Sequence, residues 1–192
     1  IRQVNGGACR LFPADLADQE GAGNLIAQVF KVFPGLNLLV NNASVYKPNT
    51  VLNADSGLFN LTMAINLKAP CLLTSQFARI CKHGDIINML DARVSRNQTH
   101  SLYYLLSKKA LKEFTQMSAL ALAPRIRVNA IAPGAILPPE GKGELYMKTL
   151  AKTVPMKGTG EVHQVLQALV FLLENRCYSG QILYIDGGMH LI

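Results

Sequence analysis

The chain has 192 residues, of which 49% are hydrophobic and 16% charged, and its 19 Lys and Arg against 12 Asp and Glu give a net charge of +7. This length fits a single domain with a substantial core, and the apolar content excludes an intrinsically disordered chain. Because no apolar run is long enough for a membrane span and the basic residues are scattered, we expect no membrane and no nucleic-acid partner, whereas a small polyanionic cofactor suits the charge.

The first half of the chain alternates strand patterns with helix patterns. An aliphatic run predicts a strand at Ala8–Phe12, and apolar residues at helical spacing then predict a helix that Asp18 caps and that ends before Pro34. A second aliphatic run predicts a strand at Leu36–Val40, and a long helix is expected from about Asp55 to Cys81.

The second half continues this alternation. Strands are predicted at Asp85–Met89, Ile126–Ile131 and Gln181–Ile185, and helices at about Ser101 to Ala123 and Glu161 to Glu174. Nearly continuous apolar strands that alternate with helices are typical of a parallel sheet covered on both faces. The predicted fold class is therefore α/β, a doubly wound parallel sheet in a single domain.

Small or polar residues follow three of the predicted strands. These segments are Asn41–Ser44, Leu90–Asp91 and Ala132–Gly134. In a doubly wound sheet, ligands bind beyond the carboxyl ends of the strands. We therefore expect the three segments to meet at a binding cleft.

Tyr104 and Lys108 lie four residues apart on a predicted helix, so their side chains share one face. An ammonium beside a phenol stabilises the phenolate and lowers its pKa from about 10 toward neutrality. Such a Tyr104 would be a general acid for hydride-transfer chemistry. Tyr103 is a second phenol, but the residue four positions after it is Ser107, so Tyr104 is preferred.

Five features in this order form one pattern over essentially the whole chain. They are Asn41-Asn42-Ala43-Ser44, Asn66 within Ala64–Pro70, the Tyr104 and Lys108 pair, Ile126–Gly134, and Ser179–Gly188. The pattern resembles the short-chain dehydrogenase/reductase family, which implies a Rossmann-type fold and an oxidoreductase.

The resemblance also implies a cofactor site. Asp15 and Leu16 would contact the adenine ring, the segment Asn42, Ala43 and Ser44 would lie along the ribose and nicotinamide, and Lys108 would bind the nicotinamide ribose. Pro133 and Gly134 would border the nicotinamide, and Asn66 would hold a proton-relay water by its backbone.

Asp91 departs from the common family pattern. Most members have a Ser 13 residues before the catalytic Tyr, and an ionised carboxyl there cannot donate to a ketone oxygen and opposes a phenolate at Tyr104. A substrate with basic ring nitrogens and N–H groups fits better. The pattern around Asp91 resembles the pteridine reductases and the bacterial dihydromonapterin or dihydrofolate reductases, which implies pterin reduction with NADPH and proton donation by Asp91 and Tyr104. Tyr46 would stack on the pterin, and Ser44 agrees with the same branch.

Three alternatives remain open at this point. Asp91 could mark a site that has lost its Ser, and Tyr46 could be an ordinary loop aromatic. The chain could then be a carbonyl or enoyl reductase of the same family, or a non-catalytic member that acts as a scaffold.

The family opens with a strand, a glycine-rich turn, a helix and a second strand. Here Gly6-Gly7 precedes a predicted strand rather than a helix N-terminus that could receive a phosphate. We therefore expect residues 1–192 to be a single, N-terminally incomplete domain of this family. A flexible substrate-binding loop is expected between Ile136 and Lys152, and the two long helices are expected to pair into a homotetramer.

The cysteines and histidines show no metal-ligand spacing. The four Cys are far apart in the sequence, without a Cys-x-x-Cys motif, and the four His share no common spacing. We therefore expect no metal, and reduced thiols in a cytoplasmic protein.

Overall fold

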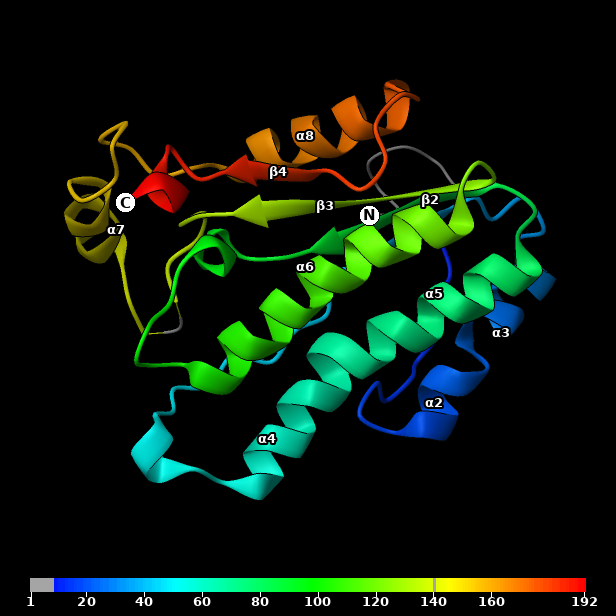
Figure 1. Ribbon diagram of the computed structural model, residues 1–192, viewed down its shortest axis with the longest axis horizontal. Helices are drawn as coiled ribbons and strands as arrows, with labels where there is room; N and C mark the ends of the chain where they lie inside the picture. The colour runs from blue at the N-terminus through cyan, green and yellow to red at the C-terminus, as the bar shows by residue number, and fades with distance from the viewer. Residues whose placement is uncertain (1–8, 140) are drawn as a thin grey trace.

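Four parallel strands form a sheet in the order β1-β2-β3-β4 (Figure 1). This computed structural model describes residues 9–139 and 141–192. The strands are β1 (Leu38–Asn41), β2 (Gly84–Met89), β3 (Ile126–Pro133) and β4 (Ile182–Ile185), and every neighbouring pair is parallel. The predicted α/β fold class and the last four predicted strands are confirmed.

The first predicted strand is wrong where the structure describes it. Cys9–Phe12 form no strand, while Ala8 and the Gly6-Gly7 pair lie outside the described residues. An aliphatic run becomes a strand only when a neighbouring strand pairs with its backbone groups. Here Leu11 and Phe12 instead line a cleft of about 390 Å³ together with residues of β1.

The helices follow the predicted pattern with two interruptions and one addition. They are α2 (Gln19–Gly23), α3 (Leu25–Val32), α4 (Ser56–Met63), α5 (Ala69–Ile80), α6 (Leu102–Leu122), α7 (Glu144–Ala151) and α8 (Val162–Glu174). The first predicted helix is divided at Asn24 into α2 and α3. The long predicted helix is present, but a π-helical segment at Ala64–Lys68 joins α4 to α5.

The expected loop between Ile136 and Lys152 is also corrected, because it contains α7. Tyr146, Met147 and Leu150 stand at positions i, i+1 and i+4, which is a helical spacing, within a segment rich in Pro and Gly. In Figure 1, α7 lies beyond the carboxyl ends of β3 and β4.

The helices bury opposite faces of the sheet. Phe77 of α5 packs in one cluster with Ile86 and Val128, while Leu172 of α8 packs with Ile87 of the other face. Adjacent strand residues point to opposite faces, so two apolar faces explain the nearly continuous aliphatic strands. Figure 1 shows α5 and α6 on one side of the sheet and α8 on the other.

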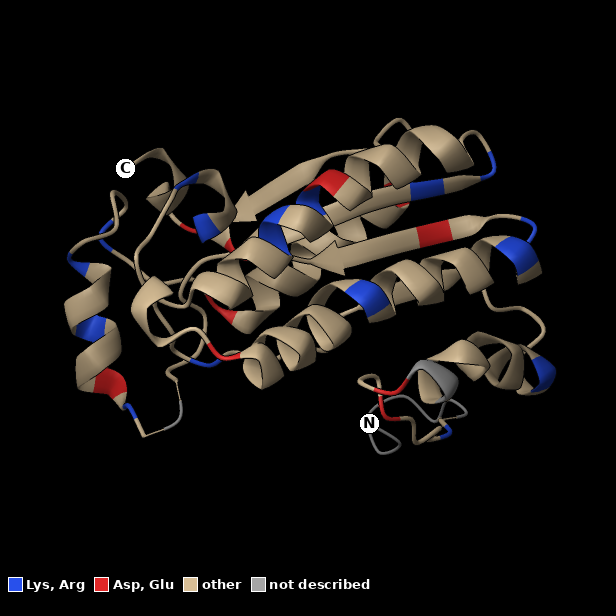
Figure 2. Ribbon diagram, turned by 60° about the horizontal axis from the view of Figure 1, so that its bottom comes forward, with Lys and Arg blue, Asp and Glu red and all other residues tan. Residues whose placement is uncertain are grey.

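The charged groups are spread over many elements. Figure 2 shows Lys and Arg on separate helices, strands and loops rather than in one stripe. Within residues 9–139 and 141–192, no helix has the length and apolar character needed to cross a membrane, and no group of three or more His, Cys, Asp or Glu could hold a metal ion.

Candidate active site

Asn66 fastens the segment after β1 to α6. The residue is fully buried in the π-helical segment, where its Oδ1 accepts a hydrogen bond from the Val45 N–H (2.7 Å) and one from the Ser44 hydroxyl (3.3 Å). Its Nδ2 donates to the Val45 carbonyl (2.9 Å) and to Ser107 Oγ (3.1 Å). The irregular helix turn therefore lets one amide side chain fix the residues that lead to Tyr46.

Tyr104 lies at the start of α6 with its phenol against Asp91. The Tyr104 hydroxyl donates to Asp91 Oδ2 at 3.0 Å, and the Tyr104 ring is almost entirely buried. Burial, followed by the charge of Asp91, raises the pKa of Tyr104 above its ordinary value. The expected lowering of this pKa by Lys108 is therefore wrong, because burial and the carboxylate outweigh the ammonium. Tyr104 consequently stays protonated at neutral pH.

Arg93 forms a bidentate ion pair with Asp91. Its Nε donates to Asp91 Oδ1 (2.9 Å) and its Nη2 donates to Oδ2 (2.7 Å). Burial alone would raise the pKa of Asp91, but the hydrogen bonds and charge of Arg93 lower it below its ordinary value. Asp91 is therefore a carboxylate at neutral pH.

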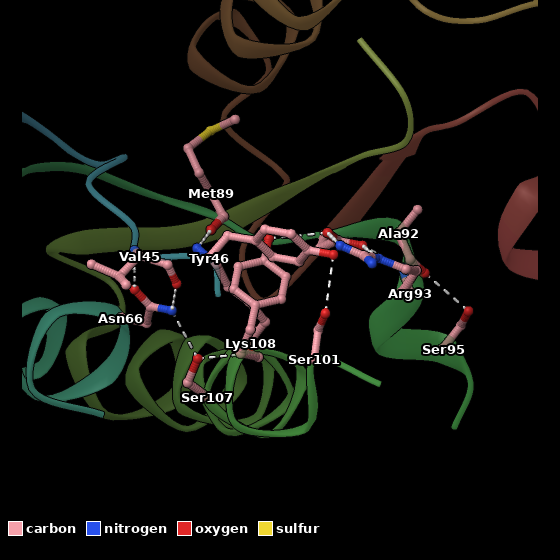
Figure 3. A network of polar contacts seen from close by, with 12 residues as sticks. Val45, Tyr46, Asn66, Met89, Ala92, Arg93, Ser95, Ser101, Ser107 and Lys108 are labelled. Carbon is pink, nitrogen blue, oxygen red and sulfur yellow. Dashed lines mark hydrogen bonds and ion pairs between the residues drawn. The ribbon is translucent and has the colours of Figure 1, made fainter. Parts of the chain in front are cut away.

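Tyr46 stands beside Tyr104 in the same group. The two rings are edge to face, with centroids 4.9 Å apart, and 48% of Tyr46 is exposed. Ser101 has a left-handed backbone (φ 54°) and donates from its Oγ to Tyr46 Oη at 3.0 Å. In Figure 3, Tyr46 lies in the middle of the network and its hydroxyl points toward Ser101 and Arg93. The exposed part of the Tyr46 ring can therefore meet a flat ligand.

Lys108 carries its ammonium to the end of β2. The side chain is buried, its Nζ donates to the Met89 carbonyl at 2.7 Å, and it lies 5.8 Å from the centroid of the Tyr104 ring (Figure 3). Burial lowers the pKa of Lys108 to about 8. Lys108 is thus mainly cationic at pH 7 and titrates close to the physiological range.

A cleft of about 440 Å³ opens over this group. Its polar side includes Tyr46, Asp91, Arg93 and Tyr104, and its other side is formed by Leu137, Met147, Leu150 and Met189, together with Gly134. Packing explains why position 134 is a glycine, because a Cβ at this position would lie 2.8 Å from Cβ of Asp186. Pro133 ends β3 beside Gly134 and is half-buried.

The predicted cofactor residues at the start of the chain lie in a different place. Leu16, Asn42 and Ala43 line the 390 Å³ cleft between the first described residues and β1. Asp15 is exposed and turned to its own loop, where its Oδ1 accepts from the Ala17 N–H at 2.8 Å. Ser44 is exposed and bonded to Asn66.

The structure thus brings the predicted catalytic residues together, namely Tyr104, Lys108, Asp91 and, one layer behind them, Asn66. Sequence reasoning missed Arg93 and Ser101. The spacing Asp-x-Arg after a strand was the available signal for Arg93, because an Asp that caps a short turn brings its carboxylate close to the residue two positions on.

The chain is similar to known proteins over nearly its whole length. The family model described as enoyl-(acyl carrier protein) reductase matches residues 2–190. A glucose 1-dehydrogenase from Gluconobacter oxydans is 32% identical over 203 residues, which cover 100% of this chain and 76% of the relative. A dihydromonapterin reductase from Escherichia coli is 32% identical over 201 residues, covering 98% of this chain and 80% of the relative.

A solved structure is similar over nearly the whole chain. It is the FolM alternative dihydrofolate reductase 1 from Brucella canis in complex with NADP, with a TM-score of 0.92 and 34% sequence identity. The match covers 97% of this chain and 75% of that one. The chain therefore spans about three quarters of this relative.

Proposed function

Since the chain belongs to the short-chain dehydrogenase/reductase family, we propose that it is an NADPH-dependent reductase of a pterin, either a dihydropterin or biopterin or a folate-type molecule. The observation that carries this proposal is the Asp91 carboxylate, which lies 3.0 Å from the Tyr104 hydroxyl in a cleft bordered by Tyr46. A carboxylate beside a phenol accepts and donates hydrogen bonds at adjacent points, as the nitrogen-rich edge of a pterin requires.

The described residues fit a dinucleotide at two points. The buried Lys108 ammonium has three N–H donors. Within the described part of the chain, one of them is bonded to the Met89 carbonyl, so the others are available to ribose hydroxyls. Asn41 Oδ1 is buried and has no hydrogen-bond partner in residues 9–139 and 141–192, and Asn41 is one of the residues that line the same cleft as Asn42 and Ala43. The residues that would hold NADPH are Asp15, Leu16, Asn42, Ala43, Ser44, Lys108, Pro133 and Gly134.

The bound NADPH would supply a hydride to the carbon of a pterin C=N bond. The hydrogen-bonded pair of Tyr104 and Asp91 delivers a proton to the nitrogen, so that the C=N bond becomes CH–NH. Lys108 offsets the negative charge that develops on Tyr104, and Tyr46 stacks on the pterin ring. Asn66 keeps the segment before Tyr46 in place.

Names of relatives support the pterin substrate. The dihydromonapterin reductase and the FolM dihydrofolate reductase match the chain at 32% and 34% identity. The second candidate is a carbonyl or enoyl reductase of the same family, which the description of the matching family model and the 32% identical glucose 1-dehydrogenase favour. A non-catalytic scaffold does not explain the assembled Tyr104, Asp91 and Lys108 side chains.

The test is NADPH oxidation, followed by its absorbance, with four substrates supplied side by side. These are dihydrobiopterin, dihydromonapterin, dihydrofolate and a β-ketoacyl thioester. We expect turnover of the pterin or folate substrates and at least tenfold less for the thioester, because a ketone offers no N–H group to Asp91. Preferential turnover of the thioester would favour the second candidate, and failure to oxidise NADPH with any substrate would favour the scaffold.

We also propose that the protein is a homotetramer. Leu106, Met117 and Leu120 of α6 are exposed and lie near one line along the helix, and Phe59 of α4 is exposed close by in the same layer. We expect light scattering to give four times the mass of the chain, and Met117→Lys with Leu120→Lys to lower that mass. A single-chain mass for the unchanged protein would contradict the proposal.

A further inference from the structure

The Arg93 side chain contacts three residues of the cleft, namely Asp91, Tyr46 and Tyr104. Besides its two side-chain bonds, its backbone N–H donates to Asp91 Oδ1 at 2.8 Å. Its Cζ lies 5.4 Å from the centroid of the Tyr46 ring and 5.5 Å from that of the Tyr104 ring. Only 21% of the side chain is exposed. Arg93 is therefore part of the cleft wall rather than a surface cation.

Building on the proposed function, we propose that Arg93 is a positioning residue that fixes Asp91 as a hydrogen-bond acceptor for an N–H group of the substrate and leaves Tyr104 as the proton donor. The assignment rests on the donors that surround the Asp91 carboxylate.

Every neighbour that the structure gives Asp91 donates a hydrogen bond to it. Oδ1 accepts from the backbone N–H and Nε of Arg93, and Oδ2 accepts from Arg93 Nη2 and from the Tyr104 hydroxyl. A carboxylate offers about four lone-pair positions, so all are occupied. The three N–H groups of Arg93 cannot accept a proton, and a neutral Asp91 would turn an O–H toward donors. Arg93 thus excludes Asp91 from the proton-donating role.

The four hydrogen bonds accepted by the Asp91 carboxylate also indicate which hydrogen-bonding groups the substrate must have. When the Tyr104 hydroxyl turns from Asp91 to a substrate nitrogen, one lone-pair position on Oδ2 becomes free beside it. The Tyr104 O–H bond then breaks as the new N–H bond forms, and the phenolate later takes a proton from water. A substrate with a ring nitrogen next to an N–H group satisfies both atoms, whereas a simple ketone leaves Oδ2 without a partner.

The experiment compares Arg93→Met and Arg93→Lys with the unchanged protein and with Arg96→Met. Arg96 belongs to the same chain segment, but its Nη1 donates to the Ile192 carbonyl, outside the Asp91 group. The readouts are the pH profile of kcat/KM for the pterin, the pterin dissociation constant from fluorescence quenching, and the carbon-13 NMR titration of the Asp91 carboxyl.

For Arg93→Met we expect the acid limb of the kcat/KM profile to move up by about 1–3 pH units, because burial of Asp91 is no longer offset. Below the displaced limb, kcat/KM should fall about tenfold for each pH unit, with a parallel weakening of pterin binding. Arg93→Lys should recover part of the shift, since the ammonium keeps the charge but not the bidentate geometry. Arg96→Met should keep the profile of the unchanged protein.

Two results would overturn the role of Arg93. One is an Arg93→Met profile that matches the unchanged protein. The other is Arg93→Met activity that rises as pH falls on the acid side of neutrality, where Lys108 is already charged, because this would make Asp91 the proton donor. If Arg93→Met does not fold, Arg93→Lys carries the same comparison. The NMR titration can be measured without turnover, so it tests the role of Arg93 independently of the proposed function. If Arg93→Met changes the titration of Asp91 but the protein reduces no pterin, the substrate assignment is overturned and the effect of Arg93 on Asp91 stands.

Discussion

Tyr104→Phe should lower kcat for the reduction by about 100- to 10,000-fold, the range that a positioned proton donor contributes. The substitution removes one oxygen, so the buried ring can keep its contacts with Tyr46 and Lys108. The dissociation constants of NADPH and pterin should therefore change far less than kcat. Stopped-flow measurement of NADPH oxidation under saturating substrate tests this directly.

Tyr103→Phe is the matched control for this substitution. Tyr103 is the adjacent phenol, and its hydroxyl accepts from the Asp55 N–H at 3.2 Å, at the start of α4 and away from Asp91. Its removal should leave kcat nearly unchanged. Equal losses in the two variants would mean that the start of α6, rather than the Tyr104 hydroxyl, supports the reaction.

Lys108 sets the expected pH dependence of the same step. Its pKa is lowered to about 8, so the ammonium is present below about pH 8 and is lost above it. Tyr104 remains protonated over this range because its own pKa is raised. The rate of the unchanged protein should therefore fall as pH rises through about 8, and Lys108→Arg should move this decline to higher pH because a guanidinium stays charged.

The sheet could be predicted from the sequence because burial on both faces leaves an unmistakable aliphatic pattern in β1 to β4. The run at Ala8–Phe12 has the same pattern, but a strand also requires a paired neighbour, and pairing is a property of distant residues. The short helix α7 was missed because its eight residues carry no side-chain cap and follow a Pro- and Gly-rich segment.

The site residues were predictable where they stand at helical spacing or directly after a strand. Tyr104 and Lys108 share a helix face, and Asp91 follows β2. For Arg93 the sequence offered only the Asp-x-Arg spacing, because the bidentate contact itself depends on the turn that Asp91 caps. The direction of the Tyr104 pKa shift was wrong for a related reason, since burial of that hydroxyl is fixed only by the packed cleft.

Asp91→Ser should separate pterin reduction from ordinary carbonyl reduction. The substitution restores the residue type that most of the family has at this position, but it removes the acceptor for Arg93 and for the substrate N–H. We expect kcat/KM for the pterin to fall by about 100- to 1,000-fold, equivalent to about 3–4 kcal/mol, because charged hydrogen bonds to a largely buried carboxylate are lost. Reduction of the β-ketoacyl thioester should stay the same or increase, since a hydroxyl can donate to a carbonyl oxygen.

The companion variant is Asp91→Asn, which keeps one acceptor oxygen and the shape of the side chain. If the shape of the Asp91 side chain determines pterin recognition, Asp91→Asn should lose less activity than Asp91→Ser. If the negative charge of Asp91 determines it, the two variants should lose equal activity. Adding Arg93→Met to Asp91→Ser should cost little more, because Arg93 acts through the carboxylate that is already gone, whereas independent sites would add their losses. Unchanged pterin kinetics in Asp91→Ser would remove Asp91 from substrate recognition, and strictly additive losses in the double variant would give Arg93 a separate contact with the substrate.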